Sequence, residues 1–113
     1  MNKKLYNKIL KNTSSYQEML MDDLKDKEFA RIYLETAFGE YQKDCNTNAL
    51  LLAMKDVAKA QGGIGKLAKK TSISREHLYD ILASKHNPRL DNWLNILTGL
   101  GFRVRLEKQK ATA

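Results

Sequence analysis

The sequence has few of the residues on which disulfide-bonded and metal-binding domains depend. Its 113 residues include a single cysteine, Cys45, so no disulfide can form within the chain, and a lone thiol is typical of a reducing cytoplasm. The two histidines, His77 and His86, have no arrangement of cysteines or carboxylates around them that would complete a zinc site. We therefore expect no metal ion and no other cofactor. With one proline and six glycines, little interrupts the chain, and strongly periodic helical segments are expected.

Long apolar runs and recognisable catalytic groups are also missing. No stretch approaches the roughly 18 consecutive apolar residues of a membrane-spanning helix, and the basic opening, MNKKLYNKILKN, lacks the apolar run of a signal peptide. We expect a soluble, cytoplasmic protein that does not contact membranes. No nucleophile, base and orienting group stand in a recognisable pattern, and the segment Gly62-Gly63-Ile64-Gly65 lacks the preceding strand of a phosphate-binding loop. The sequence predicts no enzymatic activity.

The excess positive charge is confined to one half of the chain. Residues 1–46 contain eight Lys/Arg and eight Asp/Glu, whereas residues 47–113 contain twelve Lys/Arg and five Asp/Glu, so the second half carries the whole formal charge of +7. This is the electrostatic pattern of a phosphate-binding surface, although basic surfaces also occur in proteins that bind no nucleic acid. The length is that of one domain, with an additional N-terminal arm.

Helical periodicity dominates the chain. Ser15, with a glutamate three residues later, has the spacing of a capping box, and Asp26 is a cap candidate for the next helix. That helix carries an apolar and aromatic face from Phe29 to Tyr41, which we interpret as core packing; a partner-binding surface is the alternative. A polar break at residues 44–48 ends the arm. The predicted helices are residues 3–11, 15–24, 26–43, 48–61, 64–70, 74–84 and 90–100, the last with Leu90, Trp93 (or Leu94) and Leu97 facing the core.

Residues 67–81, LAKKTSISREHLYDI, have the pattern of two short helices that meet at a tight turn. A small residue at Ala68 lets the helices cross closely, and Ser74 can cap the second helix, which contributes about 1 kcal/mol. In a DNA-binding helix-turn-helix this second helix enters the major groove. An ordinary helical hairpin is the alternative, which the flanking helices and the local positive charge disfavour. The apolar seam between the helices consists of Leu67, Ala68, Ile73, Leu78 and Ile81.

The basic half of the chain also resembles a known family. The matching segments are residues 56–60 (DVAKA), 67–71 (LAKKT), 74–79 (SREHLY) and 87–91 (NPRLD), preceded by YLETA at residues 33–37. Over about residues 28–107 the sequence is similar to the addiction-module antidote family, HigA-like antitoxins with an XRE-type helix-turn-helix. It departs from the family pattern at three positions: Ser72 and His86, where glycine is usual, and Trp93, where a small polar residue is common.

The resemblance implies a regulator that works beside a small toxin, usually a HigB- or RelE-like ribonuclease. Such antitoxins neutralise the toxin by binding it and repress their own operon by binding double-stranded DNA at its operator. Two other functions remain open from the sequence. One is a stand-alone or phage-type transcriptional repressor without a protein toxin, and the other is a protein–protein adaptor whose helix-turn-helix no longer binds DNA.

We assign candidate DNA contacts from positions within the motif. Arg75 can pair bidentately with guanine O6 and N7; its alternative is a phosphate contact or simple surface exposure. Glu76 can accept from cytosine N4, but its place in the first helical turn explains it equally well. His77 and Tyr79 are expected to reach base edges or phosphates, with packing on the loop as the alternative for Tyr79. The full candidate set is Lys66, Lys69, Ser74, Arg75, Glu76, His77, Tyr79, Lys85 and Arg89. The lysines and Arg89 are expected to hold phosphates, unless they are only solvated charges.

The last regular segment, FRVRLE at residues 102–107, alternates apolar and charged residues as a half-buried strand does. A single strand is not stable alone, so we expect Phe102, Val104 and Leu106 to pair with their own copies in a homodimer. The alternative is a strand that merely lies against the helices. Dimerisation would also suit an operator of two half-sites about one DNA turn apart.

These observations predict an all-α, lambda-repressor-like helix-turn-helix fold with a short C-terminal dimerisation strand. Residues 1–46 would form an N-terminal helical arm, which is also a possible toxin-binding region. Residues 47–107 would form the DNA-binding domain, and residues 108–113 a disordered tail.

Overall fold

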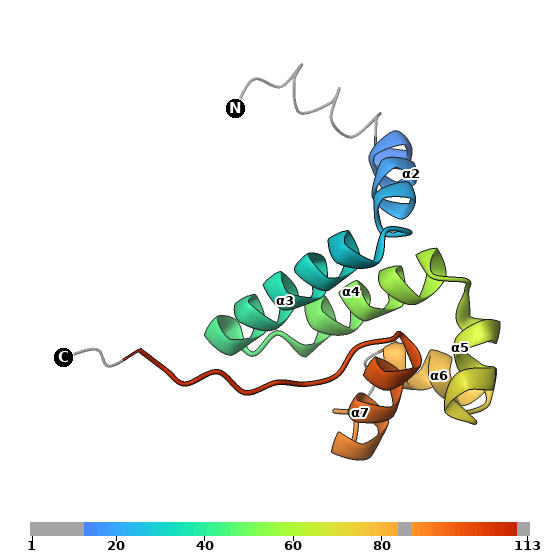
Figure 1. Cartoon of the computed structure of the whole chain (residues 1–113). Coiled ribbons are helices and arrows are strands. Elements are labelled where there is room, and N and C mark those ends of the chain that lie inside the picture. The colour runs from blue at the N-terminus through green and yellow to red at the C-terminus, as the bar shows by residue number, and fades with distance from the viewer. Residues whose placement is uncertain (1–12, 84–86, 111–113) are drawn as a thin grey trace.

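A computed structural model describes residues 13–83 and 87–110. These residues form six α-helices joined by short turns, followed by an extended C-terminal segment (Figure 1). The helices are α2 (Thr13–Asp23), α3 (Lys27–Asp44), α4 (Thr47–Ala60), α5 (Ile64–Thr71), α6 (Arg75–Leu82) and α7 (Leu90–Gly99). The predicted all-helical class is therefore confirmed, and α5 and α6 form the helix-turn-helix.

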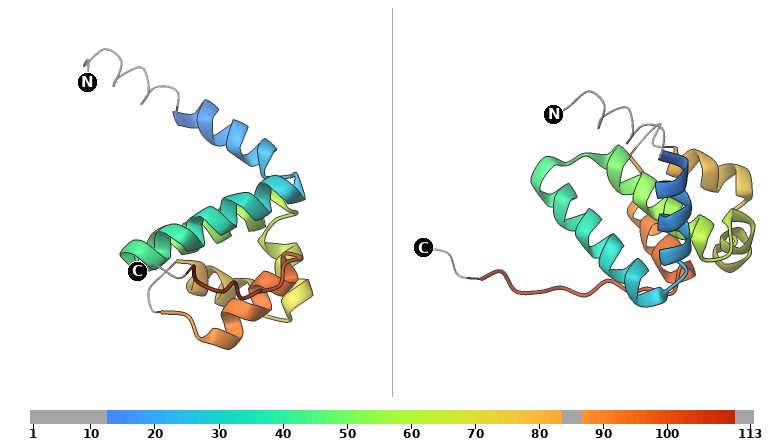
Figure 2. Two further views of the ribbon diagram at one scale, coloured as in Figure 1. Left: turned by 60° about the vertical axis from the view of Figure 1, so that its left-hand side comes forward. Right: turned by 90° about the horizontal axis from the view of Figure 1, so that it is seen from above.

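Helices α3 and α4 form an antiparallel hairpin with well-defined ends. The Asp26 carboxylate accepts hydrogen bonds from the backbone N–H of Glu28 and of Phe29, which confirms the predicted cap of α3. At the other end, Cys45 adopts a left-handed conformation with φ of 54°, and the Asn46 side chain accepts from a backbone N–H in the first turn of α4. The chain therefore reverses within two residues, and both views of Figure 2 show the two helices side by side.

The core is built around α4, which packs against α2, α3, α5 and α6. Met54 and Val57 of α4 are fully buried, and they join Leu24 from the end of the arm and Leu78 from α6, which are fully buried as well. The side-chain amide of Gln61 donates to the backbone carbonyls of residues 24 and 25, at 2.6 and 3.0 Å. The arm and the helix-turn-helix consequently share one hydrophobic core.

A buried carboxylate also joins α3 to α4. Asp56 is 6% exposed, and its Oδ2 accepts a hydrogen bond of 3.4 Å from the Tyr33 hydroxyl. Burial raises the pKa of the Asp56 carboxyl, while Lys59 and Lys55 oppose the shift. The interpretation of the α3 face as core packing is confirmed for most of its residues, but Phe29 is 41% exposed.

Two local predictions were wrong. Ser15 lies inside α2, which already includes Thr13, so it does not cap that helix. Leu90 does not face the core: it is 73% exposed, because the buried face of α7 is set by Ile96, Leu97 and the following Leu100. Both candidate faces of α7 have helical spacing, and periodicity alone does not distinguish them.

The predicted strand at residues 102–106 is not formed within the single chain, since residues 102–110 of the described chain are extended but belong to no sheet. A strand needs a neighbour for its backbone groups, and no second extended segment lies beside this one in the described residues. Only Phe102 is anchored: its N–H donates to the Leu97 carbonyl, and the Lys27 ammonium lies 5.9 Å from its ring. Val104 and Leu106 are 56% and 97% exposed.

Some predictions fall outside the described residues. These are the short helix at residues 3–11, the end of the second motif helix at Ser84, and the loop residues Lys85 and His86. Of the predicted disordered tail, residues 108–110 are described as extended and exposed, and residues 111–113 lie outside.

The turn between α5 and α6 explains one departure from the family pattern. Ser72 has φ of 59°, in the left-handed region that favours glycine. The Thr71 hydroxyl, almost fully buried, donates to the Leu67 carbonyl and accepts from the Ile73 N–H at 3.2 Å. From α7, the Asn95 side-chain amide donates to the Thr71 carbonyl at 3.0 Å. These hydrogen bonds hold Ser72 in an unfavourable backbone conformation.

We expect Ser72→Gly to stabilise the chain by about 0.5–1 kcal/mol, because glycine removes the left-handed strain at some cost in chain entropy. The measurement is the free energy of unfolding from urea titration, with an unchanged slope. Ser72→Ala is the matched control, since it retains a Cβ and should stay within about 0.5 kcal/mol of wild type. Equal stabilities of the Gly and Ala variants would contradict the assigned turn conformation.

Candidate nucleic-acid interface

Helix α6 is held on the domain by one buried face and one cap. Leu78, Ile81 and Leu82 are at most 8% exposed and pack into the core. The Ser74 side chain accepts a hydrogen bond of 3.1 Å from the backbone N–H of His77, as the cap prediction required. The opposite face of α6 is therefore presented to solvent in a fixed orientation.

The exposed face of α6 carries both signs of charge. Arg75, Glu76, His77, Tyr79 and Asp80 are all exposed. Glu76 and Asp80 are four residues apart, so they neighbour one another on this face. Carboxylates that approach DNA are favourable where they accept from cytosine N4 and unfavourable against phosphates. This face is thus suited to contact base edges rather than the DNA backbone.

Arg75 lies across the beginning of α5. The site where a Cβ of Gly65 would stand is 3.9 Å from the guanidinium carbon of Arg75. This is an ordinary van der Waals distance, so the guanidinium lies beside the first turn of α5, at the junction of the two motif helices. The structure therefore brings Arg75 of α6 together with α5, as expected for the reading end of a helix-turn-helix.

The basic residues that were expected to hold DNA phosphates differ in their surroundings. Lys69 is exposed on α5. Arg89 precedes α7 and its Nε lies 3.3 Å from an Asp91 carboxylate oxygen, an exposed ion pair of the kind that contributes little to stability. Lys85 lies outside the described residues. Lys66 differs from these residues, because its side chain lines a cavity on another side of α5.

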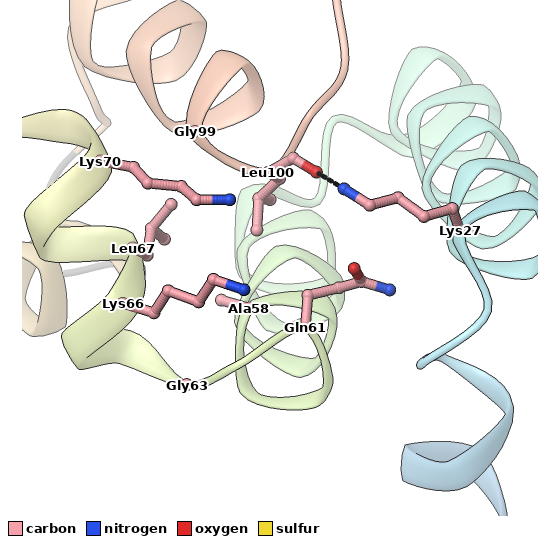
Figure 3. Close-up of a pocket in the computed structure, with 9 residues that line it drawn as sticks. All are labelled: Lys27, Ala58, Gln61, Gly63, Lys66, Leu67, Lys70, Gly99 and Leu100. Carbon is pink, nitrogen blue, oxygen red and sulfur yellow. Dashed lines mark hydrogen bonds between the residues drawn. The ribbon is translucent and has the colours of Figure 1, made fainter.

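This cavity, of about 160 Å³, was not predicted from the sequence. Figure 3 shows three lysine side chains extending into it, Lys66 and Lys70 from α5 and Lys27 from the start of α3. The i, i+4 spacing of the two α5 lysines was the only signal in the sequence. The contribution of Lys27 depends on tertiary packing. We call this the lysine cavity; its remaining lining residues are Ala58, Gln61, Gly63, Leu67, Gly99 and Leu100.

A second hollow lies between α3 and α4, with a volume of about 230 Å³. Its floor is largely apolar and its rim includes Glu40 and Asp44. The described arm, residues 13–46, carries eight Asp/Glu and four Lys/Arg, so its net charge is −4. We call this hollow the α3–α4 groove. Its lining residues are Tyr33, Thr36, Ala37, Glu40, Tyr41, Asp44, Asn46, Ala49, Leu50 and Ala53.

Within the residues that the structure describes, no three His, Cys, Asp or Glu side chains gather as metal ligands would. No helix in the described ranges is long and apolar enough to cross a membrane.

Comparison with known proteins identifies the family of this chain. The family model described as "Probable addiction module antidote protein" matches residues 13–108. The chain belongs to this family. A relative from Haemophilus influenzae, described only as an uncharacterized protein, is 25% identical over 89 residues, which cover 79% of this chain and 87% of that protein. No solved structure matches significantly.

The match to the antidote family begins earlier than the resemblance seen in the sequence, which started at about residue 28. It includes α2, so the acidic arm is part of the family unit together with the helix-turn-helix. This agrees with the shared core, in which Leu24 is as fully buried as the residues of α4.

Proposed function

We propose that this chain is the DNA-binding antitoxin of a toxin–antitoxin module, which neutralises a small HigB- or RelE-like ribonuclease and represses its own operon. The single observation that carries DNA binding is the capped, core-anchored α6, whose exposed face presents Arg75 beside the start of α5. Family membership supports the toxin partner. A stand-alone repressor is the alternative. It would share the DNA-binding face, but it would not bind a toxin at the α3–α4 groove.

For the DNA-binding face we expect Arg75→Ala to cost about 1–3 kcal/mol on the operator and to relax its specificity, because a bidentate base contact is lost. Lys69→Ala should weaken binding to all sequences alike and reduce the salt slope by about 1. Gel shifts on the chain's own upstream region and on random DNA, over a range of salt concentrations, measure both effects. An equal loss on both DNAs would remove Arg75 from base readout, and no salt-dependent shift at all would favour the adaptor.

The α3–α4 groove is the surface that we assign to the toxin. A ribonuclease needs a positive surface to hold RNA phosphates, and the arm around the groove is net negative while α4–α7 are basic. An apolar side chain of a basic partner could fill the floor near Ala37 and Ala49 while its cations meet Glu40. The charge of the arm thus favours a basic protein over DNA as its occupant.

Two exposed residues that line the groove, Glu40 and Ala49, test this assignment without disturbing the core. When the chain is co-expressed with the reading frame beside its gene, wild type should restore growth. Glu40→Lys and Ala49→Arg should fail to do so while retaining the gel shift. Arg75→Ala should show the reverse pattern, with growth restored and operator binding reduced. Restored growth by both groove variants would exclude the groove, and an adjacent frame that is not toxic would favour the stand-alone repressor.

Dimerisation of the C-terminal segment is also part of the proposal. Val104 and Leu106 project apolar side chains into solvent from one side of an extended segment, while Arg103 and Arg105 alternate with them. Backbone groups of an extended segment pair readily with another strand, and a second copy of the same segment supplies an equally apolar face. The two copies would form the strand pair that a single chain lacks.

We expect wild type to sediment at twice the 13.0 kDa chain mass and Val104→Lys/Leu106→Lys to sediment at 13.0 kDa. The physical reason is that charges on the paired face would face one another across the two-fold axis. Arg103→Gln/Arg105→Gln, on the alternate face, is the control and should remain dimeric. A monomeric wild type at micromolar concentration would contradict dimerisation through this segment.

A further inference from the structure

The lysine cavity concentrates positive charge that the DNA-binding face does not use. Lys27, Lys66 and Lys70 line it, and none of its nine lining residues is acidic. Among the described side chains, no ion pair within 4.0 Å involves these three lysines. All three lysines are exposed, so solvent screens part of their mutual repulsion, and an anion bound among them would reduce it further.

Two glycines make room for the lysine side chains. A Cβ on Gly62 would stand 2.5 Å from Cδ of Lys66, and a Cβ on Gly101 would stand 2.6 Å from Nζ of Lys27. Both glycines have positive φ. A Cβ at either position would meet only the outer part of a flexible lysine side chain, so the positive φ is what favours glycine there, and the three lysines converge as Figure 3 shows.

Lys27 is also positioned by its own contacts. Its Nζ donates to the Leu100 carbonyl at 3.2 Å, at the end of α7, where the helix dipole favours a cation. An ammonium has three donors, and this bond uses one of them. The other two remain for a ligand in the cavity, together with the ammonium groups of Lys66 and Lys70.

We propose that the lysine cavity is a phosphate-binding site. Lysine binds phosphate as a point charge with several donors, and the cavity, with a volume of about 160 Å³, has room for a tetrahedral oxyanion among the three ammonium groups. The phosphate could belong to a free phosphorylated molecule or to a DNA backbone. In the right-hand view of Figure 2, α6 lies on one side of α5 and the start of α3 with the end of α7 on the other, which favours the free molecule.

The test is a titration of the ¹⁵N-labelled full-length chain with inorganic phosphate, at constant ionic strength maintained with chloride. The amides of Gly63 and Gly99 line the cavity, and they should shift to saturation, whereas Gly39 in α3 should not. Lys66→Gln and Lys70→Gln should each weaken the affinity roughly fivefold, because each removes a charged donor. Lys59→Gln, the same change at an exposed lysine of α4 outside the cavity, should leave it unchanged.

The spectra of the variants also report whether each remains folded. Shifts that do not saturate, or that have equal affinity in Lys66→Gln, Lys70→Gln and wild type, would overturn the proposal.

The source of the phosphate is resolved by adding a short random DNA duplex to the phosphate-saturated chain. Displacement of phosphate at Gly63 and Gly99 would assign the site to a DNA backbone, and retention would assign it to a free phosphorylated molecule. The titration does not depend on operator recognition, so it stands even if the proposed DNA reading fails.

Discussion

The direction of α6 depends on a turn in which the backbone passes through a left-handed conformation at a residue that is not glycine. Thr71 holds this turn by bonding on both sides of it, to the Leu67 carbonyl and the Ile73 N–H, and Asn95 fastens it to α7. The strain at Ser72 is therefore compensated by hydrogen bonds from α5, from α7 and within the turn itself. An exposed helix face can read a surface only if its supports are rigid, and these contacts supply that rigidity.

The second constraint is the fastening of the acidic arm to the basic half. Gln61 binds the backbone at the end of α2, and Tyr33 binds the buried Asp56 across the α3–α4 hairpin. Leu24, whose carbonyl accepts one of the Gln61 hydrogen bonds, is itself fully buried in the core. The acidic residues 13–46 and the basic half are consequently parts of one packed unit, and a partner bound on the arm lies at a fixed distance from α6.

Features determined by local sequence were predictable, and features determined by distant contacts were not. The caps Asp26 and Ser74 were correct because a cap depends only on its own first helical turn. On α7 the predicted inward positions Trp93 and Leu97 were correct and Leu90 was wrong, because Leu90 and Ile96 both fit a helical period. The predicted strand is not formed in the single chain because a strand depends on a neighbour, which the described residues do not contain. The lysine cavity was missed because Lys27 meets Lys66 only after folding.

The separation of charge between the arm and the rest of the chain makes the molecule an electric dipole. Residues 13–46 carry a net charge of −4, whereas residues 1–12 carry +4 and residues 47–113 carry +7. In the field of a polyanion such a body experiences a torque as well as an attraction, so it turns its α4–α7 side forward before contact. Salt shortens the reach of this torque to about 8 Å at physiological ionic strength. The acidic residues of the arm would then help to orient the chain toward a polyanion without contacting it.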